Sequence, residues 1–224
     1  MSTTDRRTLI VDAAIDLIAA HGLRALTHRA LDTALALPAG SASYYFRTKR
    51  GLVEGIVDRI TKRSRAEFLA AQPPGAKAGT RSTKLPATPP PNSPASANDA
   101  EHVGAPLSGT AAGTGDIAHG IAVWLDRLLT ERRNHLIARH ALIIDLLGDA
   151  ELHDRLARSL FSTERARELF EALGAADPAT AAADFVAVVE GAVFDRFAGA
   201  RVHLAPGTPA SVNQLANLLA PHLR

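Results

Sequence analysis

Apolar residues recur at helical spacing in the first part of the chain. Ile10, Ala14 and Leu17 lie three or four positions apart and predict a first helix over about residues 4–20. Gly22 follows this pattern, and glycine takes the left-handed conformation that ends a helix without a Cβ penalty. The chain therefore opens with an amphipathic helix and a sharp stop.

Three more helices are predicted before about residue 71. Thr27 has the side-chain oxygen to cap a second helix whose leucines share one face. Pro38 suits the first turn of a short third helix over roughly 38–46. Thr48 is placed to cap a fourth helix, in which apolar residues repeat every four positions.

Helical spacing returns from residue 116 to the C-terminus. No alternating strand pattern competes anywhere in the chain, so the fold class predicted is all-α. Residues 150–173 fit either one long helix or two short ones. The other helices predicted here cover about residues 117–128, 136–147, 178–197 and 212–219.

Between these two helical parts the composition changes. Of the 44 residues 72–115, 32 are Ala, Pro, Thr, Gly or Ser, and 8 of the chain's 13 prolines are here. Such a segment can bury little, so we expect a flexible or polyproline-like insertion; a proline-rich recognition ligand is the alternative. The chain is thus divided into a module over 1–71, an insertion over 72–115 and a helical domain over 116–224.

Charge separates the two helical parts. Residues 1–71 carry 11 Lys/Arg against 7 Asp/Glu, whereas residues 116–224 carry 11 against 14. A basic module joined to an acidic one suggests that only the first faces a polyanion.

Several classes of function are disfavoured. The chain has no cysteine, and its polar N-terminus lacks a signal-peptide pattern. Apolar runs are too short to span a bilayer, so a cytoplasmic protein is expected. His135, His140 and His153 lack metal-ligand spacing, and no nucleophile or nucleotide motif is present, so neither a metal nor a cofactor is expected.

The short third helix carries residues that suit a DNA groove. Small side chains allow a helix to sit deep in the major groove, where hydroxyl and backbone groups reach base edges. Ala42 and Phe46, four positions apart, are expected to face inward. The residues of this segment predicted to contact DNA are Pro38, which begins the helix, and Ala39, Gly40, Ser41 and Ser43 on its exposed side.

Phosphate-binding groups flank this helix. Tyrosine hydroxyls can donate to phosphate oxygens, and the N–H groups at a helix start attract anions. The residues predicted to bind phosphate are Tyr44, Tyr45, Thr48 and Lys49 at one end, and Thr27, His28 and Arg29 at the start of the second helix.

Residues 5–65 resemble the DNA-binding domain of the TetR family of transcriptional regulators. The resemblance rests on an ordered series of positions: Gly22, Thr27, Leu31, Leu37, Gly40, Tyr44, Phe46, Lys49 and Leu52. The sequence departs from the family pattern at Ser43, where a tyrosine is common, and at Tyr45, where a histidine is common. We therefore expect one phosphate contact to be shifted or absent.

The resemblance implies an N-terminal three-helix helix-turn-helix domain and a C-terminal antiparallel helical domain. It further implies a homodimer that binds a double-stranded DNA operator, and a small-molecule inducer that releases the protein from it. A two-fold dimer suits a palindromic operator. The alternative is a helical enzyme or a protein-interaction scaffold without DNA binding.

Two sets of residues are candidates for these C-terminal roles. The last two helices are apolar with a small-residue face, and Val189, Gly191, Val193, Leu215 and Leu218 are predicted to form the dimer contact. Trp124, Leu128 and Phe185 are candidates for a ligand pocket, with plain core packing as the alternative.

Overall fold

The computed structural model describes residues 3–70 and 113–223, and within these ranges it contains helices and turns but no strand. The all-α fold predicted from the sequence is confirmed. The helices are α1 (Thr3–His21), η1 (Leu23–Ala25), α2 (His28–Ala34), α3 (Ser41–Tyr45), α4 (Lys49–Ala70), α5 (Thr114–Glu131), α6 (Arg133–Asp145), α7 (Ala150–Ala157), α8 (Thr163–Ala172), α9 (Pro178–Ala198), α10 (Pro209–Leu219) and η2 (Ala220–Leu223).

Residues 72–112 of the insertion predicted over 72–115 lie outside the described residues. Its last three residues are described, and α5 begins at Thr114, slightly earlier than expected. The segment 150–173 is two short helices: Ser162 separates α7 from α8 and accepts a hydrogen bond from the Arg165 backbone N–H at 3.3 Å, which caps α8.

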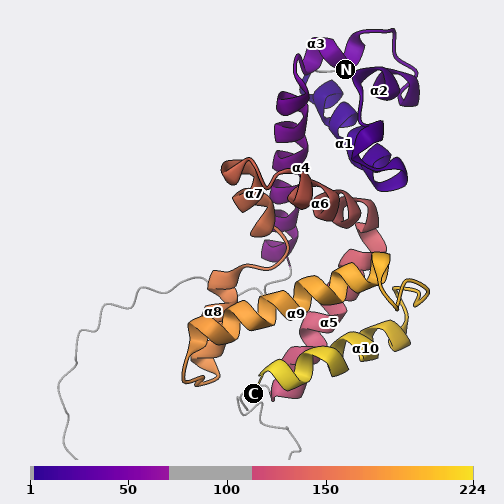
Figure 1. The fold of residues 1–224 in the computed structure, drawn as a ribbon. Helices are drawn as coiled ribbons and strands as arrows, with labels where there is room; N and C mark the ends of the chain where they lie inside the picture. Colours follow the sequence, from indigo (N-terminus) through magenta and orange to yellow (C-terminus); the bar gives the residue numbers. More distant parts are fainter. Residues whose placement is uncertain (1–2, 71–112, 224) are drawn as a thin grey trace, which may run out of the picture.

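The helices pack around two apolar cores. The first lies among α1 to α4 and the second among α5, α8, α9 and α10 (Figure 1). The first core also takes in Leu142 of α6 and Leu152 and Leu156 of α7, although these helices follow the insertion in sequence. Helices α6 and α7 therefore pack with the N-terminal module.

Ion pairs reinforce this attachment. Arg50 and Asp58 of α4 pair with Asp149 and Arg155, which lie at either end of α7. In α1, Asp16 accepts a hydrogen bond at 2.9 Å from Asn134 of α6. These contacts fix α4 against α7 and α1 against α6.

The second core contains a buried polar chain. Asp126 of α5 accepts from the hydroxyl of Ser211 at 2.5 Å, and that hydroxyl accepts from Arg196 of α9 at 2.5 Å. Asp126 also accepts from the Gly207 backbone N–H at 2.9 Å. This series of hydrogen bonds links α9 and α10 to α5, beside which both helices lie (Figure 1).

Candidate functional site

The turn between α2 and α3 is built from unusual backbone conformations. Thr27 caps α2 as predicted, accepting from the Ala30 N–H at 3.1 Å. Ala36 and Gly40 have φ values of 49° and 90°, and only glycine adopts the second without strain. Because Gly40 is left-handed, α3 begins at Ser41 instead of at Pro38, and residues 38–40 belong to the turn.

Asp32 fixes the start of α3. Its side chain is buried, and its two carboxylate oxygens accept from the backbone N–H groups of Gly40 and Ala42, each at 2.7 Å. Charge-assisted bonds of this kind are about twice as strong as neutral ones. Asp32 was not among the residues predicted from the sequence. The only sequence signal for its role is that it is an acidic residue beside Leu31, on the inner face of a short helix.

The other end of α3 is also held from within. Ala42 and Phe46 are buried, which confirms the inward face predicted for this helix. Arg7 of α1 donates to the Tyr45 carbonyl at 2.6 Å, and its guanidinium lies 4.3 Å from the centre of the Phe46 ring. Helix α3 is therefore a short, rigid element clamped at both ends.

The side chains around α3 divide by exposure. Tyr44 is 78% exposed, whereas Tyr45 packs partly against the first core, and the two rings meet edge to face at 5.2 Å. Of the predicted DNA contacts, His28, Ser41 and Tyr45 are half-buried, and Thr27, Arg29, Pro38, Ala39, Gly40, Ser43, Tyr44, Thr48 and Lys49 are exposed.

Three of these residues are restricted in how they can bind. The hydroxyls of Ser41 and Ser43 donate to the backbone carbonyls of Pro38 and Gly40 at 2.6 and 2.8 Å. In this state they offer lone pairs, not protons, to a partner. The Nε2 atom of His28 is buried, so only the other side of its ring faces outward.

The cations that follow α3 have different surroundings. Arg47 and Lys49 are exposed and form no ion pair within the described residues. Arg50, the next cation, pairs with Glu54 at 3.0 Å and with Asp149 of α7. Two neighbouring cations are therefore available to a phosphate backbone, while the third holds the fold together.

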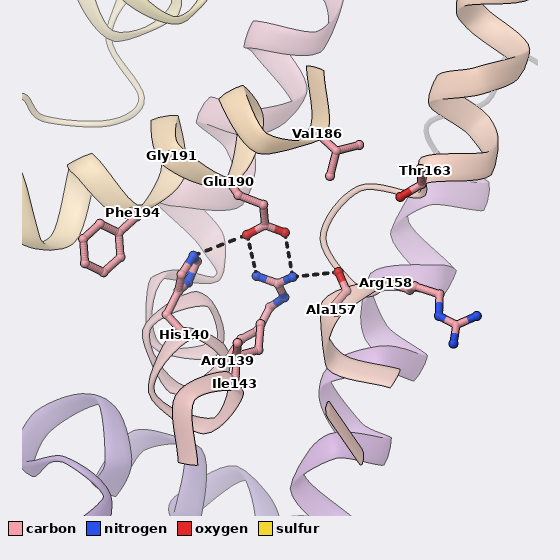
Figure 2. A pocket seen from close by; sticks show the side chains of 10 residues that line it. All are labelled: Arg139, His140, Ile143, Ala157, Arg158, Thr163, Val186, Glu190, Gly191 and Phe194. Carbon is pink, nitrogen blue, oxygen red and sulfur yellow. Dashed lines mark hydrogen bonds and ion pairs between the residues drawn. The ribbon is translucent and has the colours of Figure 1, made fainter. Parts of the chain in front are cut away.

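A second candidate site is a cavity of about 530 Å³ between α6, the segment joining α7 to α8, and α9 (Figure 2). Arg139 of α6 lies on its floor with an exposed fraction of only 1%. The guanidinium makes a two-pronged ion pair with Glu190 of α9, at 2.8 and 2.7 Å. It also donates to the carbonyls of Leu156 and Ala157 at the end of α7, at 3.1 and 3.0 Å.

Glu190 is held in its charged form. Burial by itself raises the pKa of this carboxyl group, but hydrogen bonding and the charges of His140 and Arg139 outweigh burial and leave the pKa lowered. The base of the cavity therefore carries the Glu190 carboxylate, with its lowered pKa, beside the Arg139 guanidinium.

The residues predicted to bind a ligand lie elsewhere. Leu128 and Phe185 are buried in the second core, and Trp124 packs edge to face on Phe161 at 5.9 Å. None of them lines this cavity. The structure thus supports the alternative of plain core packing for Trp124, Leu128 and Phe185, because the aromatic rings fill the space between α5, α8 and α9.

The residues predicted to form a dimer contact are also largely internal. Val189, Val193 and Leu215 have no exposed surface, and Leu218 is half-buried, because these side chains pack inside the second core. That placement corrects the prediction for the three fully buried residues. Gly191 alone among the five is exposed.

Two family models match the sequence. The model described as "Bacterial regulatory proteins, tetR family" matches residues 10–56, and the one described as "Tetracyclin repressor-like, C-terminal domain" matches residues 112–221. The chain belongs to the TetR family. It is accordingly a helix-turn-helix DNA-binding regulator of transcription, and the family assignment favours this function over a helical enzyme or scaffold.

Several solved structures share the fold over nearly the whole chain. A TetR-family member from Streptomyces coelicolor A3 is 21% identical with a TM-score of 0.58, covering 96% of this chain and 98% of its own. A putative TetR-family transcriptional regulator from Rhodococcus sp. is 17% identical with a TM-score of 0.57, covering 98% and 100%. The multidrug binding protein EbrR complexed with ethidium is 19% identical with a TM-score of 0.53, covering 96% and 98%. No curated protein matches the chain.

Neither a membrane-spanning helix nor a group of metal ligands is found within residues 3–70 and 113–223. No helix there has the length and apolarity needed to span a membrane, and no three potential metal ligands come together. His135, one of the histidines considered for metal binding, has a pKa lowered to about 4, first by burial and then by the charges of Arg132 and Arg63.

Asp32 gives a direct test of how α3 is positioned. In Asp32→Asn, one carboxylate oxygen becomes an amide N–H that faces a backbone N–H, so we expect the free energy of unfolding to fall by about 2–4 kcal/mol. Urea unfolding followed by circular dichroism measures this change. The adjacent exposed substitution Thr33→Ala is the control, expected within about 0.5 kcal/mol of the parent protein. Equal stability of the two variants would show that Asp32 does not hold α3.

Proposed function

We propose that this TetR-family regulator is a cytoplasmic homodimeric repressor that leaves a palindromic operator when a small molecule enters the cavity between α6 and α9. The observation that carries the proposal is the Arg139–Glu190 pair. It forms the floor of the cavity and is bonded directly to the end of α7, the helix that holds α4.

DNA binding by the face around α3 is supported by its chemistry. The exposed residues there are small, hydroxyl-bearing or cationic, and Tyr44 projects from the end of the helix. The small residues suit base edges, while Tyr44, Arg47 and Lys49 suit the phosphate backbone. Because Asp32 and Arg7 clamp α3, this face is preorganised before DNA arrives.

A salt titration distinguishes phosphate contacts from structural cations. Lys49→Ala should weaken binding to specific and non-specific DNA alike, and should reduce the slope of log K against log salt by about one for each phosphate that Lys49 neutralises. Gel-shift titrations at several salt concentrations measure both quantities. Arg50→Ala is the matched control: its side chain pairs with Asp149, so its slope should stay that of the parent protein. An unchanged slope in Lys49→Ala would remove Lys49 from the interface.

Dimerisation through α9 is supported by an exposed row of residues. Ala183, Ala187, Gly191, Phe194 and Ala198 lie three or four positions apart on one face of the helix; we call them the α9 stripe. Phe194 is 48% exposed, which is unusual for so large an apolar side chain. Small residues beside it allow a second helix to approach closely. A self-complementary contact of this kind places two DNA-binding faces on a two-fold axis.

Gly191 provides a clean test of this interface. No heavy atom lies within 4 Å of the position its Cβ would take, so a side chain can leave Gly191 without a clash at its first carbon. We expect it to overpack the contact between protomers and to yield monomers with reduced operator affinity. Light scattering during size-exclusion chromatography measures the mass. Gly120→Leu, at an exposed position of α5, is the matched control, since its Cβ position is equally open. A Gly191→Leu protein that remains a dimer would place the interface elsewhere.

Communication between the cavity and DNA can follow the polar contacts of α7. Glu190 holds Arg139, Arg139 holds the last carbonyls of α7, and Arg155 and Asp149 of α7 hold α4. A ligand that changes the Glu190–Arg139 geometry therefore shifts the helix on which α4 rests. A ligand shifts the equilibrium between two conformations of a protein only if it interacts differently with each of them.

The coupling can be tested once a binding compound is found. A thermal-shift screen of small molecules identifies ligands, and each is then added to an operator gel shift. We expect compounds that stabilise the protein to weaken operator binding. In Arg155→Ala, which cuts one tie between α7 and α4, ligand affinity should persist while the effect on DNA is reduced. Stabilising ligands that leave DNA affinity unchanged in the parent protein would contradict the proposed repressor mechanism.

A further inference from the structure

A second hollow lies beside the cavity proposed for the small molecule, across the ring contact between His140 and Phe194. It is a groove of about 410 Å³ between α6, the last turns of α9 and the end of α1. The cavity extends the other way, towards Arg158 and Thr163, and the two rings that border both hollows lie 5.8 Å apart. Apart from Arg133 and His140, the described residues that line the groove are alanine, isoleucine and phenylalanine. The groove is therefore almost wholly apolar.

Large apolar side chains stand exposed around this groove. Ile144 of α6, which lines it, is 68% exposed, and Leu147, one helical turn further along the chain, is 71% exposed. Phe194 of α9 is 48% exposed. Single exposed apolar residues are common on protein surfaces, but a group of them marks a surface that binds a partner.

Helix α6 turns one face inward and the other towards the groove. Ala138 and Leu142 are buried in the first core, with the DNA-binding helices. Arg133, Ile137 and Ile144 are spaced by four and seven positions and so share the opposite face, which lines the groove. A partner seated there therefore touches a helix that packs with the DNA-binding module.

The groove is continuous with the α9 stripe. Phe194 and Ala198 belong to the stripe and also line the groove. A protein that covers the stripe at these two residues therefore also lies over the groove and meets Ile144 on its other side.

Charges at the two ends of α6 favour a second copy of this chain as the partner. Arg133 at the start of the helix and Asp145 at its end are exposed, and neither forms an ion pair within residues 3–70 and 113–223. A two-fold axis that crosses α6 near its middle reverses the partner helix and brings Arg133 towards the partner's Asp145. Opposite charges then meet at both ends of the same contact, with the apolar residues between them.

We propose that a second copy of this chain covers the groove between α6 and α9, so that the dimer contact reaches from the α9 stripe onto α6. The inference rests on the proposed function, because dimerisation through α9 is part of it. It adds a helix of the first core to the interface. The partner then holds the DNA-binding module directly, through α6, and fixes the distance between the two DNA-binding faces.

Thiol reactivity tests whether α6 is covered. The chain has no cysteine, so Ile144→Cys introduces a single thiol into the full-length protein. Val123→Cys on α5 is the matched control; in an isolated protomer it should react with a soluble maleimide more slowly than Ile144→Cys, since Val123 is 46% exposed. In the dimer we expect this order to reverse, with Ile144→Cys at least about tenfold slower, because a covered thiol reacts mainly in the dissociated fraction. Light scattering on the same samples gives the mass.

A charge at the same position tests whether the contact contributes to affinity. An aspartate at position 144 stays in water in the protomer but is buried in the dimer, so Ile144→Asp should raise the dimer Kd at least about tenfold. Analytical ultracentrifugation measures this constant. Val123→Asp should dimerise like the parent protein, and thermal melting checks that both variants are folded.

Two results would overturn the inference: a dimer in which Ile144→Cys reacts as fast as Val123→Cys, or an Ile144→Asp protein that dimerises as tightly as the parent. A parent protein that is monomeric at every concentration would reject the proposed homodimer together with this interface. A protected thiol at position 144 in a dimer that Gly191→Leu leaves intact would keep the α6 contact and reject only the α9 stripe of the proposed function.

Discussion

The buried guanidinium of Arg139 is the constraint that organises the C-terminal helices. An arginine with 1% exposure is tolerated only if its charge is neutralised and its donors are satisfied, and here α7 and α9 provide both. Such a pair adds little net stability compared with apolar packing, but the loss of one partner leaves the other charge buried and unpaired, which is strongly destabilising. The positions of α6, α7 and α9 are therefore coupled, which is the property that a ligand-controlled protein needs.

The two apolar cores determine which helices this coupling connects. Helices α6 and α7 follow the insertion in sequence, yet they pack with α1 and α4 in the first core. Helix α6 makes polar contacts with α9 through Arg139 and His140, which both meet Glu190. A movement of α9 relative to α6 can thus reach α4 without disrupting either core, because close-packed cores move as units.

Much of the fold could be predicted from the sequence because it depends on local rules. Apolar spacing located the helices, Thr27 capped α2, and the inward face of Ala42 and Phe46 was correct. The start of α3 was misplaced at Pro38, since the left-handed Gly40 extends the turn. The candidate site was harder: apolar residues such as Val189 and Phe185 look alike in sequence whether they face a partner, a ligand or their own core, and here they face the core.

The sequence by itself determined the helices, the separation of charge and the ordered residues around the third helix, since each depends on neighbours within a few positions. Only the tertiary structure decided that Asp32 holds α3, that Arg50 binds Asp149 and that Arg139 meets Glu190. Arg50 and Asp149 are 99 residues apart, and Arg139 and Glu190 are 51 apart. Contacts at such separations leave no periodic trace in the chain, because they arise from how the helices pack and not from the conformation of any one of them.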